Sequence, residues 1–305
     1  MTADLSVRIG ALRLKNPVLT ASGTFGYGTE YADYADLSKL GGIVTKTVTL
    51  EPRDGNPMPR LAETPAGMLN SIGLANVGVE RFIADKLPAL EGLDAAVIVN
   101  VAGNTADEYG ALTERVESCP RVDAVEVNVS CPNVEQGGLV FGTDPKTLAR
   151  VVGKVRRATK KPIIVKLTPN VTDIAQMAKS AADAGADALS LINTLVGMAV
   201  DIETRRPLIG RTFGGLSGPA IKPVALAMVY KVFKAVSVPV IGIGGITDWK
   251  DAIEFLIAGA AAVQVGTWNF VDPGGAVKAA LGIQDYCDRK NILAIGELVG
   301  TLVES

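Results

Sequence analysis

Polar or glycine residues close eight short apolar segments of this 305-residue sequence, and their types could do chemistry. A lysine can bind or stabilise an anion, and an asparagine amide offers both a hydrogen-bond donor and an acceptor. Ordinary strand ends can also be polar, but lysine and asparagine recur here more often than solvation requires. The eight closing residues are Ser22, Lys46, Asn100, Asn128, Lys166, Asn193, Gly244 and Gly266.

Lys166 ends the apolar run Ile163-Ile164-Val165. Such a strand offers no exposed position, so we expect the amine to be buried. A buried lysine can form a Schiff base with a carbonyl substrate, or it can stabilise an anion on a cofactor. The residues alone leave both roles open.

The sequence contains no histidine, which excludes Ser-His-Asp and Cys-His catalysis and any histidine-bound metal. Cys131 follows a predicted strand and lies close to Gly137-Gly138, in a segment typical of a mobile loop. A free cysteine is most often a buried small hydrophobe. However, polar flanks and a thiol pKa of about 8.5 suit a general base, and we predict that role for Cys131. Cys119 and Cys287 are interpreted as structural.

Two glycine-containing segments follow the last two apolar runs, at Gly242–Ile246 and at Val265–Thr267. Glycines allow backbone N–H groups to approach an anion, and the N-terminus of a following helix adds a favourable dipole. Either segment alone could be a tight turn. Together, one βα unit apart, they predict a phosphate site.

The apolar runs alternate with helical segments, which predicts a parallel α/β fold. Eight runs and glycine at the last two strand ends favour a (β/α)8 TIM barrel over an open sheet. We expect one domain over residues 1–305, a hairpin within Leu5–Leu14, and long active-site loops at Thr47–Val77 and Ser130–Thr143. The predicted strands are Val18–Ala21, Gly42–Lys46, Ala95–Val101, Ala124–Val129, Ile163–Leu167, Ala188–Ile192, Val240–Ile243 and Val263–Gly266. The predicted helices include Asp144–Thr159, Asp173–Ala184, Pro219–Val236 and Asp248–Ala258.

Composition narrows the function classes. Hydrophobic residues make up 48% and charged residues 20%, and the formal net charge is −2, so no basic surface predicts nucleic-acid binding. Three widely spaced cysteines without a CxxC pair argue against a disulfide framework, a metal site or an iron–sulfur cluster in this chain. The opening residues lack signal-peptide features, and the uncharged stretch Phe255–Val271 is too short and too polar for a membrane span. We therefore expect a cytoplasmic protein.

At this point the motifs resemble those of the dihydroorotate dehydrogenase family. They occur in the same order over about Leu14 to Phe270, nearly the whole chain, and eight motifs in register are highly specific. The motifs are Ala21-Ser22-Gly23-Thr24, Thr45-Lys46-Thr47, Asn70-Ser71-Ile72-Gly73-Leu74, Asn128-Val129-Ser130-Cys131-Pro132-Asn133, Val165-Lys166-Leu167, Asn193-Thr194, Gly214-Gly215-Leu216-Ser217-Gly218-Pro219 and Gly242-Ile243-Gly244-Gly245.

The resemblance also indicates a class. A cysteine base is a mark of class 1, and Asn193–Met198 with Phe213–Pro223 is similar to class 1B, the NAD-linked class. Such catalytic subunits hold FMN and pair with a subunit that carries FAD and a [2Fe–2S] cluster. The resemblance thus implies a homodimer of this chain within a heterotetramer of two catalytic and two electron-transfer subunits.

The resemblance assigns roles by position and implies oxidation of (S)-dihydroorotate to orotate in de novo pyrimidine biosynthesis. Cys131 would remove a proton from C5 while hydride passes from C6 to N5 of FMN, and Lys166 would stabilise the reduced flavin. The Ser130–Thr143 loop would close over the substrate. FMN would contact Ser22, Lys46, Thr47, Asn100, Asn128, Lys166, Ile192, Gly218, Gly244, Gly245, Gly266 and Thr267. The substrate would contact Lys46, Asn70, Ser71, Ile72, Gly73, Leu74, Asn128, Asn133, Asn193 and Thr194.

Three alternatives remain open from the residues. Lys166 could serve a Schiff-base lyase or aldolase whose substrate phosphate binds at Gly244 and Gly266. A barrel acting only as an interaction scaffold would leave the strand-end lysines and asparagines without a purpose. A related dehydrogenase for uracil-like pyrimidines would use the same machinery on a different ring.

Overall fold

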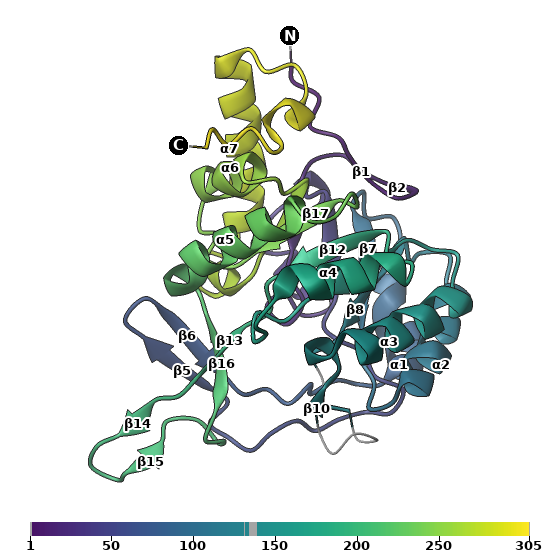
Figure 1. Cartoon of the computed structure of the whole chain (residues 1–305), viewed down its shortest axis with the longest axis vertical. Helices are drawn as coiled ribbons and strands as arrows, with labels where there is room; N and C mark the ends of the chain where they lie inside the picture. Colours follow the sequence, from purple (N-terminus) through teal and green to yellow (C-terminus); the bar gives the residue numbers. More distant parts are fainter. Residues whose placement is uncertain (1, 131, 134–138, 305) are drawn as a thin grey trace.

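A computed structural model describes residues 2–130, 132–133 and 139–304 of the chain (Figure 1). Eight parallel strands form a closed barrel in the order β11-β12-β17-β18-β3-β4-β7-β8, which confirms the predicted (β/α)8 fold. All eight predicted strands are present, with ends that differ by at most two residues. They are β3 (Val18–Thr20), β4 (Gly42–Val44), β7 (Ala96–Val101), β8 (Ala124–Asn128), β11 (Ile163–Lys166), β12 (Ala188–Leu191), β17 (Val240–Ile243) and β18 (Ala262–Val265).

The barrel strands are buried on both faces, because helices cover the outside and side chains fill the interior. Every residue of β8 and β11 is buried, including Glu126 and Lys166. In the barrel register Lys166 lies opposite Asn128 on one neighbouring strand and Ser190 on the other. Asn100 lies opposite Glu126. The register therefore brings polar residues from four strands, β7, β8, β11 and β12, close together inside the barrel.

The outer helices begin where the sequence predicts. Asp144, Asp173 and Asp248 are N-caps whose side chains accept hydrogen bonds from backbone N–H groups of the first turn. The predicted helix Pro219–Val236 differs, because a 3-10 turn at Pro219–Ile221 precedes α5. The α-helices around the barrel are α2 (Ala106–Glu117), α3 (Pro145–Ala158), α4 (Ile174–Asp183), α5 (Lys222–Phe233), α6 (Trp249–Ile257) and α7 (Gly275–Lys290).

The predicted N-terminal hairpin is also present. Strands β1 (Val7–Ile9) and β2 (Leu12–Leu14) pair around Gly10, whose positive φ of 57° suits glycine. Gly10 packs against Asp187, directly before β12 begins. The hairpin therefore closes the amino-terminal end of the barrel, away from the predicted site.

A four-stranded antiparallel sheet, which the sequence did not predict, rises beside the opposite end. We call it the wall sheet, and it consists of β5 (Leu61–Thr64), β6 (Gly67–Asn70), β13 (Leu195–Gly197) and β16 (Gly214–Ser217). It joins the long loop after β4 to the segment after β12, and Asn70 lies opposite Gly215. The small hairpin of β14 (Val200–Asp201) and β15 (Arg206–Pro207) projects beyond it (Figure 1).

The second predicted loop, Ser130–Thr143, contains a short hairpin of β9 (Pro132–Asn133) and β10 (Leu139–Val140). The predicted base Cys131 lies outside the described residues, and so does the prediction that this loop closes over a substrate. Within the described part of the chain, no helix combines the length and apolar character needed to cross a membrane.

Candidate active site

One cavity lies between the carboxyl ends of the barrel strands and the wall sheet. It is lined by residues from both predicted sets, which the fold brings together from positions spread between Ser22 and Thr267. From the predicted cofactor set, the lining includes Ser22, Lys46, Thr47, Asn128, Lys166, Ile192, Gly218, Gly244, Gly245, Gly266 and Thr267. From the predicted substrate set, it includes Lys46, Asn70, Ile72, Leu74, Asn128, Asn193 and Thr194.

Three predicted residues lie behind this lining. Asn100 is fully buried in the barrel interior. The Ser71 hydroxyl accepts a hydrogen bond from Asn56 Nδ2 at 2.8 Å. Gly73 has a positive φ of 71° and packs against Asn56, so it shapes the loop rather than the cavity surface. Asn133 belongs to β9, but its side chain lies outside the described residues.

Glycines at the ends of β17 and β16 form a close-packed cradle on one side of the cavity. Gly244 and Gly245 have φ values of 130° and 71°, a region that side-chain-bearing residues rarely adopt. A Cβ atom at Gly245 would come within 3.0 Å of the Gly218 carbonyl oxygen. The Thr267 hydroxyl pairs with Ser217 Oγ at 2.8 Å across the same corner. Backbone groups and hydroxyls therefore dominate this surface, as in phosphate sites of barrels.

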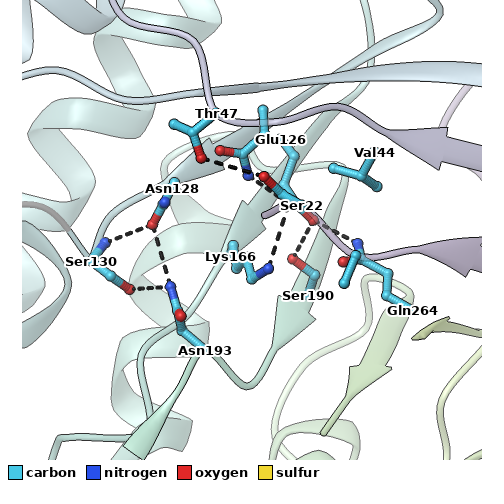
Figure 2. A network of polar contacts seen from close by, with 12 residues as sticks. Ser22, Val44, Thr47, Glu126, Asn128, Ser130, Lys166, Ser190, Asn193 and Gln264 are labelled. Carbon is cyan, nitrogen blue, oxygen red and sulfur yellow. Dashed lines mark hydrogen bonds and ion pairs between the residues drawn. The ribbon is translucent and has the colours of Figure 1, made fainter. Parts of the chain in front are cut away.

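A polar cluster fills the barrel interior directly below the cavity (Figure 2). We call Asn100, Glu126, Lys166, Ser190 and Gln264 the Glu126 cluster. The fully buried Glu126 carboxylate accepts hydrogen bonds from Asn100 Nδ2 at 2.7 Å, Ser190 Oγ at 2.9 Å and Gln264 Nε2 at 2.6 Å. Lys166 Nζ lies 4.0 Å from Glu126 Oε1. Lys166 is thus a cation that faces the cavity and has a carboxylate behind it.

A second set of amides lies at the end of β8, as Figure 2 also shows. Asn193 Nδ2 donates to Ser130 Oγ at 2.8 Å, and the Ser130 N–H donates to Asn128 Oδ1 at 3.1 Å. The Tyr109 hydroxyl donates to the Asn128 carbonyl oxygen at 2.6 Å and so holds the strand end in place. Asn70 Nδ2 donates to the Gly215 carbonyl oxygen across the wall sheet at 3.1 Å. These amides are oriented before any ligand arrives.

Lys46 lines the same cavity in a different environment. It is half-buried, and burial lowers the pKa of its amine; the nearby Arg60 guanidinium lowers it further, while the Glu30 carboxylate partly opposes the shift. No carboxylate lies within ion-pair distance of its Nζ among the described residues. Lys46 is therefore a cation without a built-in partner, directed toward a cavity with amide donors and acceptors.

The sequence also carries a signal for Glu126, which was not among the predicted site residues. Glu126 interrupts the apolar run Ala124-Val125-Glu126-Val127, and a carboxylate inside a buried strand needs hydrogen-bond partners. Ser130 and Ser217 were likewise not predicted as separate site residues. Their partners come from distant strands, so no local pattern identifies them.

Other candidate chemistry is sparse in the described residues. They contain no group of three or more cysteine or acidic side chains placed to hold a metal ion. Cys119 and Cys287 are both buried, in keeping with the structural role predicted for them. Desolvation raises the pKa of the Cys287 thiol, which makes it a poor nucleophile.

Comparison with known proteins agrees with the motifs. The family model described as dihydroorotate dehydrogenase matches residues 4–286. A Geotalea daltonii protein is 60% identical over 299 residues, which cover 98% of each chain. Proteins of Geotalea uraniireducens and Pelobacter propionicus are 58% and 57% identical, with coverage of 98% and 99%. All three are named dihydroorotate dehydrogenase B (NAD(+)), catalytic subunit, which confirms the resemblance found in the sequence. The chain therefore belongs to the dihydroorotate dehydrogenase family of oxidoreductases.

Proposed function

We propose that this chain is the catalytic subunit of an NAD-linked enzyme that oxidises (S)-dihydroorotate to orotate in de novo pyrimidine biosynthesis. One observation carries the proposal: the glycine cradle, Lys166 and the amide-rich wall all line the same cavity. Full-length relatives with the corresponding name support it.

The cavity suits FMN in three respects. The cradle around Gly244 and Gly245 presents backbone to a phosphate where a Cβ atom would collide with its neighbours. Asn128 lines the cavity opposite Lys166 in the barrel register and offers an amide to the polar edge of a flavin ring. Lys166 supplies a cation at the barrel floor. When bound, FMN would accept the hydride that the chain's own residues cannot take.

The residues proposed to hold FMN fall into three groups. Gly218, Gly244, Gly245, Gly266 and Thr267 would bind the phosphate end. Ser22, Lys46, Thr47 and Ile192 would border the ring, with Ser22 Oγ 3.3 Å from Thr47 Oγ1. Asn100, Asn128 and Lys166 would approach it from the barrel interior.

The substrate would lie between this surface and the wall sheet. Lys46 would bind the dihydroorotate carboxylate, because no carboxylate of the described residues lies at ion-pair distance from its Nζ. Asn70, Asn128, Asn193 and Thr194 would bind the imide edge, since each amide can both donate and accept. Ile72 and Leu74 would cover the ring, while Ser71 and Gly73 would hold their loop in shape. Asn133 and Cys131 would complete the site from the β9–β10 side, with Cys131 as the base at C5.

The partner and assembly proposals rest on the family. The relatives' name, catalytic subunit, supports a separate electron-transfer subunit. We infer that this subunit carries FAD and a [2Fe–2S] cluster, passes electrons to NAD, and assembles with a homodimer of this chain as a heterotetramer. We also propose one catalytic domain over residues 1–305, because residues from Ala3 to Leu298 share a single core cluster. A cytoplasmic location stays a prediction.

An anaerobic titration with dihydroorotate tests the function. We expect the purified protein to be yellow and its flavin absorption to bleach on addition of dihydroorotate. NAD should restore the absorption quickly only when the co-expressed partner subunit is present. Cys131→Ala should keep FMN but lose reduction by dihydroorotate, and unchanged single-turnover reduction would remove Cys131 from the mechanism.

The same preparation separates the alternatives. Bleaching by dihydrouracil but not by dihydroorotate would favour a dehydrogenase of uracil-like pyrimidines. A colourless protein trapped by borohydride together with a carbonyl substrate would indicate Schiff-base chemistry at Lys166.

A further inference from the structure

Glu126 is a charged residue in the centre of the barrel, where burial of a carboxylate is costly. Three donors from three other barrel strands converge on it: Asn100 of β7, Ser190 of β12 and Gln264 of β18. Four of the eight strands thus contribute a side chain to one group. Because three other strands each supply a matched donor, we infer that the carboxylate at this position has a specific role.

All three neighbouring side chains donate their hydrogen bonds to the Glu126 carboxylate. Both amides turn their NH2 groups toward Glu126, and the serine hydroxyl reaches the second carboxylate oxygen together with Gln264. The amide oxygens Asn100 Oδ1 and Gln264 Oε1 have no hydrogen-bond partner within the described structure. An ionised carboxylate, which can only accept hydrogen bonds, matches these three donors.

Lys166 supplies the opposite charge. Lys166 is 6% exposed and lines the cavity, and its Nζ lies 4.0 Å from Glu126 Oε1. Among the described residues, the buried charged side chains are Glu126, Lys166 and Asp251, and Asp251 is paired with Lys222 outside the barrel. From the elements around the pair, the groups facing it are the neutral Asn100, Ser190 and Gln264, with the cation Lys46 lining the same cavity.

We propose that Glu126 is a positioning residue that keeps the Lys166 amine protonated and directs it toward the flavin side of the cavity. This inference rests on the proposed function only in naming a flavin as the ligand that Lys166 faces. Without Glu126, burial of an unpaired ammonium would favour the neutral amine, and Lys166 would lose its proton at a lower pH. The buried carboxylate thus preserves a cation where negative charge develops during flavin reduction.

The first experiment needs no flavin and measures the free energy of unfolding against pH for the wild type and Glu126→Gln. If Lys166 loses its proton early in folded Glu126→Gln, the unfolded chain binds more protons there, so stability rises with pH. We therefore expect the difference in free energy of unfolding between the wild type and Glu126→Gln to narrow between about pH 7 and about pH 10. The control Ser190→Ala removes one hydrogen bond but keeps the charge, so its difference from the wild type should not depend on pH.

The second experiment measures the midpoint potential of bound FMN against pH in anaerobic dye equilibration. Flavin reduction takes up a proton, so the potential falls with pH in every variant, and loss of the Lys166 proton should steepen that fall. In Glu126→Gln the steepening should begin at a lower pH than in the wild type. In a Lys166→Met background, Glu126→Gln should not change how the potential depends on pH, because no Lys166 proton remains to be lost. The proposal would be overturned if the difference in free energy of unfolding between Glu126→Gln and the wild type stayed constant across pH. It would also be overturned if Glu126→Gln still changed the pH dependence of the potential in the Lys166→Met background.

A charge swap covers the case in which Glu126→Gln does not fold. Glu126→Gln combined with Gln264→Glu keeps one carboxylate and one amide in the pair now bonded at 2.6 Å, but moves the charge away from Lys166. The pH at which its flavin potential begins to fall more steeply should lie below that of the wild type, and an identical pH would count against the proposal. A colourless preparation would reject the proposed function, while the unfolding measurement would still test the Glu126–Lys166 pair.

Discussion

Two lysines at the carboxyl ends of barrel strands experience opposite surroundings. Lys166 ends β11 inside the barrel and lies 4.0 Å from the buried Glu126 carboxylate. Lys46 follows β4 and lines the same cavity, where burial and Arg60 lower its pKa. The two residues look equivalent in the sequence, because each follows a short apolar run. Their charge partners come from other strands and loops.

The difference separates two tasks. A cation with a built-in carboxylate is balanced before any ligand binds, so it can hold its charge in a buried place. A cation without a partner gains most from an incoming anion, because the ligand's carboxylate relieves its desolvation. Lys166 therefore suits stabilisation of charge that develops during reaction, and Lys46 suits substrate binding.

The largest expected effect compares the same substitution at both lysines. Lys166→Met should lower the free energy of unfolding by about 3 kcal/mol, because Glu126 would be left as an uncompensated buried charge. Lys46→Met should change it by no more than about 1 kcal/mol, because a half-buried group is partly screened by solvent. Urea unfolding of the FMN-free proteins measures both. Equal losses would show that the two environments do not differ in the way described.

A smaller effect concerns ligand affinity. Lys46→Met should weaken orotate binding by about tenfold to a hundredfold, as loss of a hydrogen bond to a charged group costs about 1.5–3 kcal/mol. Calorimetric titration with orotate measures the change. Lys179→Met is the matched control, because Lys179 is exposed on α4 and should leave the affinity unaltered. Unchanged affinity in Lys46→Met would assign the carboxylate to another residue.

The smallest effect is a pH dependence. The pKa of Lys46 is lowered, chiefly by burial and then by Arg60, so its charge is lost at a lower pH than for an ordinary lysine. Orotate affinity of the wild type should therefore fall as pH rises, whereas Lys46→Arg keeps its charge. The ratio of the two affinities, measured over a pH series, removes any contribution from ionisation of orotate itself. A constant ratio would contradict the lowered pKa.

Much of the barrel was predictable from local patterns. The eight apolar runs match the eight barrel strands, and the aspartates before three helices are N-caps in the structure. The wall sheet was not predictable in this way. Its strands are short, half-exposed and rich in glycine, and Asn70 pairs with Gly215 from a segment 145 residues away. No periodicity within either segment reveals such a partner.

The site was predictable in its members but not in its electrostatics. Strand-end positions and family motifs identified Lys46, Asn128, Lys166 and Asn193, and the fold brings all four to one cavity. Glu126 was missed because a motif analysis follows strand ends, whereas Glu126 lies within a strand. Its importance appears only in the tertiary structure, where donors from β7, β12 and β18 surround it; Figure 2 labels those from β12 and β18.

The sequence by itself determined the barrel, the convergence of its polar strand ends and the family, because alternating apolar runs and helices close in only a few ways. Only the tertiary structure decided which lysine has a carboxylate partner and which faces the cavity without one. The reason is physical: the charge of a buried amine depends on desolvation and on groups within a few ångströms, and those groups come from distant parts of the chain.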